Sequence, residues 1–272
     1  MINKKIAFIG AGNMSAAIIR GLVADGYPAN LIMATNPSQE KLDILARDCG
    51  ISVSNDNQAG LSFGEIVVLA VKPQLISDVC ASFNFEELNN PCFVSIAAGL
   101  PLKRLGELLN HSTNIVRVMP NTPSAIGEGM SGIYAGAGVP QDSVDFIVEM
   151  MKKVGDAIVV ENESDINTVI AAAGSSPAYF FLIAEAMQNE AMKMGINKSD
   201  ARRLVQQAML GSAKMLKSNE GTEAAQLRAN VTSKGGTTHQ AIVSLQDNNI
   251  EDIFAEAMRA AVARANEMAN EF

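Results

Sequence analysis

The stretch "KIAFIGAGNMSAAIIRGL", residues 5–22, joins a short apolar run to a glycine turn and then to a segment with helical spacing. The apolar run is typical of a buried strand, and the turn stands where a helix would begin. Gly10 allows a tight turn, and Gly12 lets the backbone approach a pyrophosphate held at the helix N-terminus. Ser15 replaces the third glycine of the usual motif and is still small enough for close packing. The stretch predicts a strand, turn and helix that bind a dinucleotide, with a plain glycine turn as the alternative.

The rest of the first half alternates strands with helices. Near-continuous apolar runs, typical of strands buried on both faces of a parallel sheet, occur at residues 31–35, 65–71, 92–98 and 114–120. Helical spacing occurs at residues 14–25, 38–49, 74–83 and 102–109. Two more runs, 132–136 and 157–160, would extend the sheet around a helix at 142–154. Residues 1–163 are therefore predicted to form a doubly wound, mainly parallel α/β domain.

The second half has a different pattern, without convincing strands. Helical segments are expected at residues 165–173, 177–194, 198–216, 222–230, 237–246 and 250–271. Residues 164–272 are therefore predicted to form an all-α domain. Residues 178–194 are apolar around most of the helix, and such a surface must be covered. A second copy of the domain is the expected cover, which makes this a dimerisation domain; burial within one chain is the alternative.

Composition limits the function classes. The chain has 272 residues, of which 48% are hydrophobic and 18% charged, as in a folded soluble protein. Its formal net charge of −8 makes nucleic acid and anionic membranes unlikely partners. The longest apolar runs look too short to span a bilayer, and the first residues lack the features of a signal peptide. We expect a cytoplasmic protein that binds neither nucleic acid nor membrane.

Cysteine and histidine give no sign of a metal site. Cys49, Cys80 and Cys92 form no CxxC pair, and His111 and His239 are the only histidines. No set of these residues has zinc-ligand spacing. We expect reduced thiols packed as small hydrophobic groups, and structural histidines.

The end of the second predicted strand, "ATNPS" at residues 34–38, bears on the choice of cofactor. An NAD-specific site usually offers Asp or Glu to the ribose hydroxyls here, whereas this chain offers Asn36 and Ser38, with Lys41 one turn later. Without a carboxylate, the 2′-phosphate of NADP meets no repulsion and could be held by these side chains. The sequence predicts NADP(H), with NAD(H) as the alternative. Ser38 could also cap the helix that follows.

Three later strand ends should lie on the same edge of the sheet. The segment "AVKPQ", residues 70–74, places Lys72 and Pro73 at the carboxyl end of a central strand, where open α/β sheets bind ligands. "SIAAG", residues 95–99, and "RVMPNTP", residues 117–123, end the next two strands. The pattern indicates a cofactor cleft with one cation beside it.

Two glycine-rich segments interrupt the helical half. "GSSP", residues 174–177, is predicted to open a helix, and "NVTSKGGTTHQA", residues 230–241, is predicted to be a loop leading into a helix N-terminus. Each alone is more often a cap than a site. Together, opposite a dinucleotide cleft, they suggest a pocket for a small carboxylate.

The chain resembles the pyrroline-5-carboxylate reductase family in seven motifs that follow one another from end to end. They are "FIGAGNM" (8–14), "AVKP" (70–73), "SIAAG" (95–99), "RVMPNTP" (117–123), "GSSPAYFF" (174–181), "GSAKML" (211–216) and "VTSKGGTTHQAI" (231–242). Lys234 stands where the last motif usually has proline. The resemblance implies a Rossmann domain followed by a helical domain that interlocks with a partner's to form a homodimer, with a decamer as a higher alternative. It also implies reduction of 1-pyrroline-5-carboxylate to L-proline by NADPH or NADH, the last step of proline biosynthesis.

The resemblance further implies the site residues. The implied cofactor contacts are Gly10, Ala11, Gly12, Asn13, Met14, Asn36, Asn57, Ala70, Val71, Lys72, Pro73 and Ala97, to which the strand end adds Ser38. The implied substrate residues are Glu220, Asn230, Ser233, Gly235, Gly236, Thr237 and Thr238. Glu220 is the weaker transfer, because it depends on how the loop before "AAQL" (residues 224–227) is aligned with the family's.

Thr238 is the candidate catalytic residue. The ring nitrogen becomes an amine as hydride arrives, so it needs a proton or a hydrogen-bond donor. Because a neutral hydroxyl is a weak acid, we expect Thr238 to orient and polarise a protonated imine. Water or the substrate's own nitrogen are alternative proton sources.

Two other functions remain open from the sequence. A β-hydroxyacid-dehydrogenase-like enzyme, or another imine reductase, would share the domain plan. β-Hydroxyacid dehydrogenases use a lysine one turn into the helix that corresponds to residues 174–186, and no Lys occurs between Gly174 and Gln188. A non-catalytic NADP-binding regulatory protein would be expected to lose the loop residues, yet Gly235, Gly236 and Thr238 are present.

Overall fold

The computed structural model describes residues 3–86 and 88–271. The chain divides into two compact units, one of Met1–Ser175 with Ala260–Phe272 and the other of Ser176–Arg259. The boundary expected between residues 163 and 164 was placed where the sequence pattern changes. That domain boundary stays a prediction, because the division into compact units follows contacts within the chain. It places residues 164–175, which follow the predicted boundary, in the first unit.

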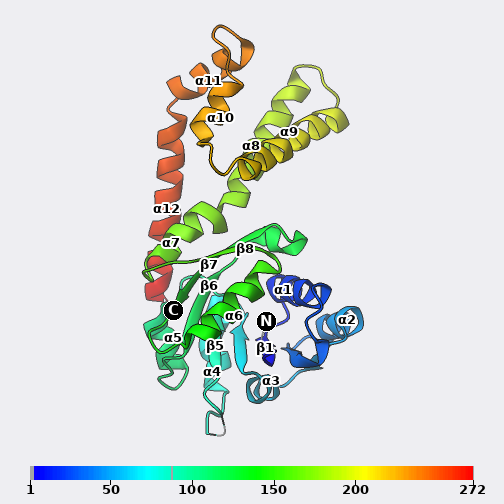
Figure 1. Ribbon diagram of the computed structural model, residues 1–272, viewed down its shortest axis with the longest axis vertical. Coiled ribbons are helices and arrows are strands. Elements are labelled where there is room, and N and C mark those ends of the chain that lie inside the picture. Colours follow the sequence, from blue (N-terminus) through cyan, green and yellow to red (C-terminus); the bar gives the residue numbers. More distant parts are fainter. Residues whose placement is uncertain (1–2, 87, 272) are drawn as a thin grey trace. The chain divides into compact units, whose positions relative to one another are not determined.

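The first unit contains an eight-stranded sheet (Figure 1). Its strands are β1 (Ile6–Ile9), β2 (Ile32–Thr35), β3 (Ser52–Ser54), β4 (Ile66–Leu69), β5 (Cys92–Ser95), β6 (Ile115–Met119), β7 (Gly129–Ala135) and β8 (Gly155–Val159). Their order is β3-β2-β1-β4-β5-β6-β7-β8, and only β6 and β7 pair antiparallel. The order reverses next to β1, as in a doubly wound fold. The mainly parallel α/β prediction is confirmed.

Helices cover both faces of this sheet. They are α1 (Asn13–Ala24), α2 (Gln39–Cys49), α3 (Asn57–Phe63), α4 (Pro73–Ala81), α5 (Leu102–Leu108) and α6 (Gln141–Lys152), with short 3-10 turns at Ala29–Leu31 and Thr122–Ile126. Along β1, Ile6 and Phe8 join the core cluster that contains α1, α2 and α6. Ala7 and Ile9 join the opposite cluster with α3, α4 and α5. Alternate strand residues thus supply two cores, which is why the strand sequences are apolar throughout.

The sequence prediction missed β3 and α3. β3 has three residues, "SVS", and none of them is fully buried. It is held at the sheet edge by pairing with β2, through Met33, Ala34 and Thr35. So short a polar strand has no apolar run by which a pattern could find it. α3 follows because the Asp56 carboxylate accepts a hydrogen bond from the Gln58 N–H at 2.9 Å and caps the helix.

A helix begins within residues 174–177 as predicted, but it does not start from a loop. α7 (Asp165–Val169) continues through a π-helical turn, Ile170–Gly174, into α8 (Ser176–Lys193). Ser175 keeps helical backbone angles, and its N–H donates to the Ile170 carbonyl at 2.7 Å. The chain therefore enters α8 from a preceding helix, so this end exposes no fresh set of N–H groups.

The same continuous helical run corrects the expectation that the apolar segments are too short to span a bilayer. Asp165–Lys193 spans 29 residues and contains an 18-residue window with a mean hydropathy of 1.4, which is long and apolar enough to cross a bilayer. Length and composition alone thus do not exclude a span there. A helix covered by another protein surface passes the same test.

The second unit contains helices only, within the part of the chain that the structure describes. They are α8, α9 (Lys198–Ser218), α10 (Ala224–Asn230), α11 (Thr237–Asp247) and the first part of α12 (Ile250–Glu271). No residue of α8, α10 or α11 is buried, and α9 buries only Ala201 and Val205. The all-α prediction is confirmed, and the single chain leaves this unit without a core of its own.

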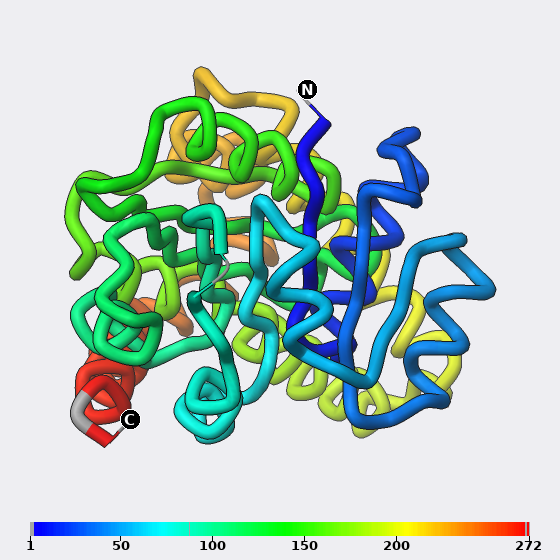
Figure 2. The backbone as a smooth tube through the Cα atoms, turned by 90° about the horizontal axis from the view of Figure 1, so that it is seen from below, coloured from blue at the N-terminus to red at the C-terminus, as the bar shows by residue number. Residues whose placement is uncertain are grey.

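The C-terminal end of α12 belongs to the first unit. It lies beside α5 and the loop before it (Figure 2). In that loop Gly99 has a φ of 80°, and a Cβ at Gly99 would come within 2.8 Å of the Met268 Cβ. Ala265 packs with Ile166 and Ile170.

All three cysteines are buried and free. Burial raises the pKa of both the Cys80 and the Cys92 thiols to about 12. At neutral pH these thiols are protonated and unreactive, in agreement with the expected packing role.

Candidate functional site

The predicted cofactor residues gather at one edge of the sheet. Ile9 is level with Thr35 of β2 and Leu69 of β4, and Leu69 is level with Ser95 of β5. The residues that follow these strands therefore share one edge, here named the carboxyl rim. It comprises residues 10–14, 36–38, 70–73 and 96–97, with residues 120–121 after β6. In open α/β sheets this is the edge that binds ligands.

The glycine turn at the start of α1 has the geometry of a phosphate cradle. Gly10 has a φ of 109°, and a Cβ there would lie 2.8 Å from the Ala70 carbonyl oxygen, so only glycine fits. The Ser15 hydroxyl donates to the Gly10 carbonyl at 2.6 Å and holds the turn from below. At Gly12, the N-cap of α1, a Cβ would meet nothing within 4 Å. A pyrophosphate therefore fits over this helix N-terminus.

Asn36 lies at the centre of a hydrogen-bond network on the rim. Its Oδ1 accepts from the Ala11 N–H at 3.3 Å, which joins the strand end to the glycine turn. Its backbone N–H donates to the Ser54 carbonyl at 3.2 Å, and its carbonyl accepts from Asn55 Nδ2 at 3.0 Å. The position is thus fixed on three sides, with an amide where a carboxylate is usual.

Ser38 occupies the N-cap position of α2, but its side chain makes no capping hydrogen bond. The expectation that this hydroxyl caps the helix is wrong. Ser38 is half-buried and Lys41 is exposed on the next turn, so both side chains can reach solvent beside Asn36. That arrangement suits a phosphate group next to the strand end.

The segment after β4 contributes backbone groups and one cation to the rim. Lys72 is exposed and stands at the N-cap of α4, with Pro73 as the first helical residue. Ala97 is buried, and its N–H donates to the Ser95 hydroxyl at 3.4 Å. Asn57, at the start of α3, accepts a hydrogen bond from the Thr35 hydroxyl at 2.6 Å. The sequence alone did not indicate this contact.

The predicted substrate residues lie in the second unit, in the turn between α10 and α11. Gly235 has a φ of 76°, and the Gly236 N–H donates to the Ser233 carbonyl at 2.9 Å. Lys234 is exposed, so a lysine in place of proline is accommodated in solvent. Asn230 ends α10, where its Oδ1 accepts from Gln226 Nε2 at 2.8 Å.

The turn ends in a helix start whose N-cap residue has no side chain. Gly236 is the N-cap of α11, and among the described residues no side chain hydrogen-bonds to the N–H groups of the first turn there. Thr237 and Thr238 are exposed at the first two positions of the helix. Such an end binds anions, a carboxylate among them, and the Thr238 hydroxyl is beside it.

Glu220 lies apart from this turn in sequence. It is exposed in the connection between α9 and α10, where the Thr222 N–H donates to the Asn219 carbonyl at 2.8 Å. The cofactor residues and the substrate residues belong to different compact units, so their assignment to one active site stays a prediction.

The two histidines differ in their surroundings. His111 has a φ of 59° in the turn after α5, and its N–H donates to the Gly106 carbonyl at 2.8 Å, which is a structural role. His239 is half-buried in α11, and its Nδ1 has no hydrogen-bond partner among the described residues. Within residues 3–86 and 88–271, no three His, Cys, Asp or Glu side chains gather as a metal site would need.

One polar residue on the rim was not found from the sequence. Asn121 is buried, and its side chain bridges two segments: Nδ2 donates to the Ala173 carbonyl at 3.0 Å, and Oδ1 accepts from the Met130 N–H at 2.8 Å. The motif "RVMPNTP" contains it, but spacing alone does not reveal contacts so distant along the chain.

Comparisons with known proteins agree with both halves of the chain. Residues 163–268 match the family model for pyrroline-5-carboxylate reductase dimerisation, and residues 5–99 match the model for coenzyme F420-dependent NADP oxidoreductases. The pyrroline-5-carboxylate reductase of Vibrio alginolyticus is 53% identical over 268 residues, which cover 98% of each chain.

Solved structures give the same result. A pyrroline-5-carboxylate reductase from Coxiella burnetii is 40% identical, with a TM-score of 0.91 over 98% of this chain and 99% of that one. The Plasmodium falciparum enzyme, solved with NADP bound, is 27% identical, with a TM-score of 0.85 over 99% of both chains. These relatives cover nearly the whole chain, and the sequence motifs, the fold and the match of the helical half agree with them. The chain belongs to the pyrroline-5-carboxylate reductase family.

Proposed function

We propose that this chain reduces the carbon–nitrogen double bond of 1-pyrroline-5-carboxylate to give L-proline, with NADPH as the hydride donor. The observation that carries the proposal is the presence, in one chain of this family, of two glycine-based anion cradles. One is the open turn at Gly12, and the other is the uncapped start of α11 at Gly236. The first suits a dinucleotide and the second a small carboxylate.

The glycine turn before α11 would capture the substrate. A carboxylate accepts hydrogen bonds from the N–H groups of the first helical turn, and the positive end of the helix dipole adds to the attraction. Gly235 and Gly236 carry no side chains that would crowd this approach. Asn230, Ser233 and Thr237 border the same turn and would help to orient the ring.

Thr238 would act on the ring nitrogen. When bound, NADPH would supply a hydride to the ring carbon. The protonated imine nitrogen then becomes a secondary amine and keeps its proton. The exposed Thr238 hydroxyl can donate to, or accept from, that nitrogen and so hold the protonated imine in line. It need not be a strong acid, because the imine can arrive already protonated.

The rim residues would hold the cofactor. Gly10 to Met14 would receive the pyrophosphate, and Asn36 and Ser38 would receive the adenosine 2′-phosphate that distinguishes NADP from NAD. Ala70 to Pro73 and Ala97 would line the nicotinamide half, while Asn57 supports Thr35 behind the strand end. The absence of Asp and Glu at residues 34–38 favours NADPH over NADH.

A turnover assay tests the function. Purified protein should oxidise NADPH when the imine is added, and amino-acid analysis should find proline in equal amount. Oxidation of a β-hydroxy acid with NADP⁺ in place of this reaction would support the dehydrogenase alternative. NADPH binding without turnover of either substrate would support a regulatory protein.

Substitution of Gly236 separates capture of the substrate from chemistry. A Cβ at this position would lie 2.6 Å from the Ser233 Oγ and 3.1 Å from the Ser233 carbonyl oxygen. Gly236→Val should therefore distort the carboxylate cradle and raise the KM for the imine about tenfold or more, with a smaller change in kcat. Steady-state kinetics at saturating NADPH measure both constants. An unchanged KM would remove Gly236 from the carboxylate site.

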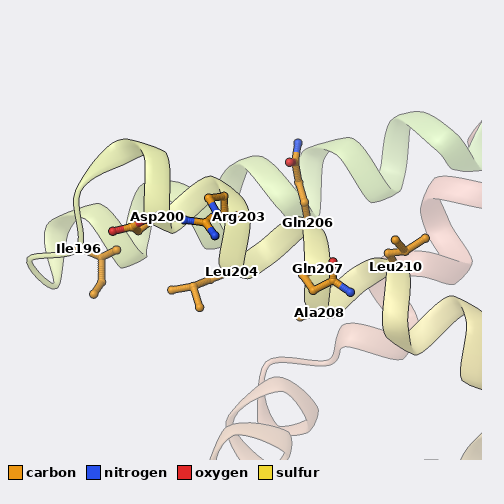
Figure 3. A pocket seen from close by; sticks show the side chains of 8 residues that line it. All are labelled: Ile196, Asp200, Arg203, Leu204, Gln206, Gln207, Ala208 and Leu210. Atoms are coloured by element: carbon orange, nitrogen blue, oxygen red, sulfur yellow. Dashed lines mark hydrogen bonds and ion pairs between the residues drawn. The ribbon is translucent and has the colours of Figure 1, made fainter.

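The helical unit requires a partner to cover its apolar surface. Phe181 and Leu182 on α8 are 68% and 66% exposed. On α9 a cavity of 910 Å³ opens to the surface, and Figure 3 shows Ile196 and Leu204 standing out from the helical ribbon beside it. Because residues 163–268 match a dimerisation model, we propose that a second copy of this unit covers these side chains in a homodimer.

Stability should then depend on protein concentration. Folding and association are linked in an obligate dimer, so Tm should rise as the concentration is raised from about 1 to about 100 μM. Light scattering should give the mass of a dimer or of a higher assembly such as a decamer. A fully active monomer at micromolar concentration would contradict the proposal. We place the enzyme in the cytoplasm, with its small-molecule substrate and without nucleic acid or membrane partners.

A further inference from the structure

Asn121 stands at a junction between the sheet and the helix that follows it. Its amide nitrogen donates to the carbonyl of Ala173, in the π-helical turn Ile170–Gly174, at 3.0 Å. Its amide oxygen accepts from the Met130 N–H at the start of β7 at 2.8 Å. The residue is 8% exposed, so both hydrogen bonds are shielded from water. One side chain thus joins the end of β6, the start of β7 and the π turn.

The π turn is packed closely at this junction. A Cβ at Gly174 would lie 2.9 Å from the Met119 Cε, and a Cβ at Gly132 would lie 2.6 Å from Val169 Cγ2. Pro177 has no N–H and cannot supply the Ala173 carbonyl with the usual donor four residues on. The Asn121 amide donates to that carbonyl from outside the helix.

The junction lies on the nicotinamide side of the rim. The pyrophosphate belongs at β1 and the adenosine ribose at the end of β2, so the reacting half of the cofactor extends the other way, over β4, β5 and β6. Ser95 pairs with Arg117. Ala97 and Met119, each two residues later, therefore lie at the same level of the rim. Asn121 and the π turn follow directly.

We propose that Asn121 is a positioning residue for hydride transfer: its amide fixes the π turn and residues 174–175 against the rim beside the nicotinamide. The proposal rests on the reductase function. π-Helical turns interrupt a regular helix at a cost and are frequent at functional sites, so a dedicated tie is reasonable here. Without the tie the turn loses its hydrogen bond to the segment after β6, and its backbone can shift along the rim. A displacement of about 1 Å near reacting atoms is enough to lower a rate about a hundredfold.

The test compares Asn121→Ala with a matched control on the same strand. Asn114, just before β6, is 7% exposed, and its Nδ2 donates to the Asn90 carbonyl at 3.2 Å. It lies at the opposite end of β6 from the rim. Asn121→Ala should lower kcat for the imine about tenfold to a hundredfold with little change in either KM, whereas Asn114→Ala should lower Tm but leave kcat within about twofold of the wild type.

Asn121→Asp gives a second readout that a merely structural role would not produce. The ionised carboxylate can still accept from Met130, but it cannot donate to Ala173. A protonated carboxyl can do both. The ratio of variant to wild-type kcat should therefore rise at least about threefold as the pH is lowered from 8 to 6, because burial raises the pKa of a carboxyl group. Equal loss of kcat in Asn121→Ala and Asn114→Ala, or a pH-independent ratio for Asn121→Asp, would overturn the proposal.

Hydrogen exchange separates this proposal from the proposed function. In the wild-type protein the amides of residues 170–176 should exchange slowly, and Asn121→Ala should speed them at least about tenfold while the amides of β1 stay protected. This measurement needs no turnover. If wild-type protein fails to reduce the imine, the reductase function fails whatever the exchange shows. Unchanged exchange at residues 170–176 in a folded Asn121→Ala protein would refute the tie itself.

Discussion

Replacing Thr238 by alanine should lower kcat by roughly ten- to a thousandfold, the range found when one positioned hydrogen-bond donor is removed from a transition state. The hydroxyl is exposed at the second position of α11, and none of the side-chain hydrogen bonds that hold the described residues together involves it. Its loss should therefore leave the turn and the backbone N–H groups unchanged. Affinity for NADPH should hardly move, because the cofactor residues lie on the rim of the other unit.

The control for this change is Thr238→Ser, which keeps the hydroxyl and removes one methyl group. It should retain kcat within about tenfold, while Thr238→Ala does not. The measurement is steady-state kinetics with the imine varied at saturating NADPH. If Thr238→Ala turns over as fast as the wild type, Thr238 has no part in the chemistry. The loop would then be a carboxylate cradle only, and the proton would come from water or from the substrate's own nitrogen.

Replacing Asn36 by aspartate should weaken NADPH binding roughly a hundred- to a thousandfold and leave NADH binding nearly unchanged. A carboxylate about 4 Å from a phosphate charge is repelled by about 4 kcal/mol at an effective dielectric constant of about 20, which corresponds to about a thousandfold in Kd. Solvent at this half-buried position reduces the effect, hence the lower bound. NADH has no 2′-phosphate, and its ribose hydroxyls can donate to a carboxylate.

The structure indicates that this substitution is tolerated by the fold. Asn36 Oδ1 accepts from the Ala11 N–H, and an aspartate oxygen can accept in the same place. Among the described residues, the side-chain donation that is lost is the long one from Asn36 Nδ2 to the Ser38 carbonyl, at 3.4 Å. The change therefore alters charge and little else, so the two cofactors can be compared directly.

A charge-matched control is available at the opposite edge of the sheet. Asn89 is exposed in the loop before β5 and lines a pocket with Lys5 and Glu65, the residues just before β1 and β4. Asn89→Asp adds the same charge at this amino edge and should leave both cofactors unaffected. Fluorescence titration with NADPH and NADH gives the two Kd values for each variant. Equal weakening of both cofactors in Asn36→Asp would refute the assignment of this strand end to the 2′-phosphate.

Local sequence was sufficient to predict an element wherever the residues of that element alone have a recognisable pattern. The run of residues 5–22 specifies a strand, a turn and a helix because Gly10 permits a positive φ and because buried parallel strands are apolar on both faces. The helical half was equally visible, since no convincing strand pattern follows residue 164 and the chain there has helical spacing. The motif at Gly235 and Gly236 predicted a turn before a helix, and α11 begins there.

Only the tertiary structure decided the features that depend on distant partners. β3 forms because its backbone pairs with β2. Its own three residues have no hydrophobic pattern typical of a strand. Residues 174–177 have the composition of a helix start, yet contacts with Met119 and Asn121 carry the chain through a π turn. Ser38 sits where a cap is expected and does not cap. A sequence pattern reports the preferences of neighbours along the chain, whereas a hydrogen bond between residues 52 apart, such as that from Asn121 to Ala173, forms only once the fold has brought them together.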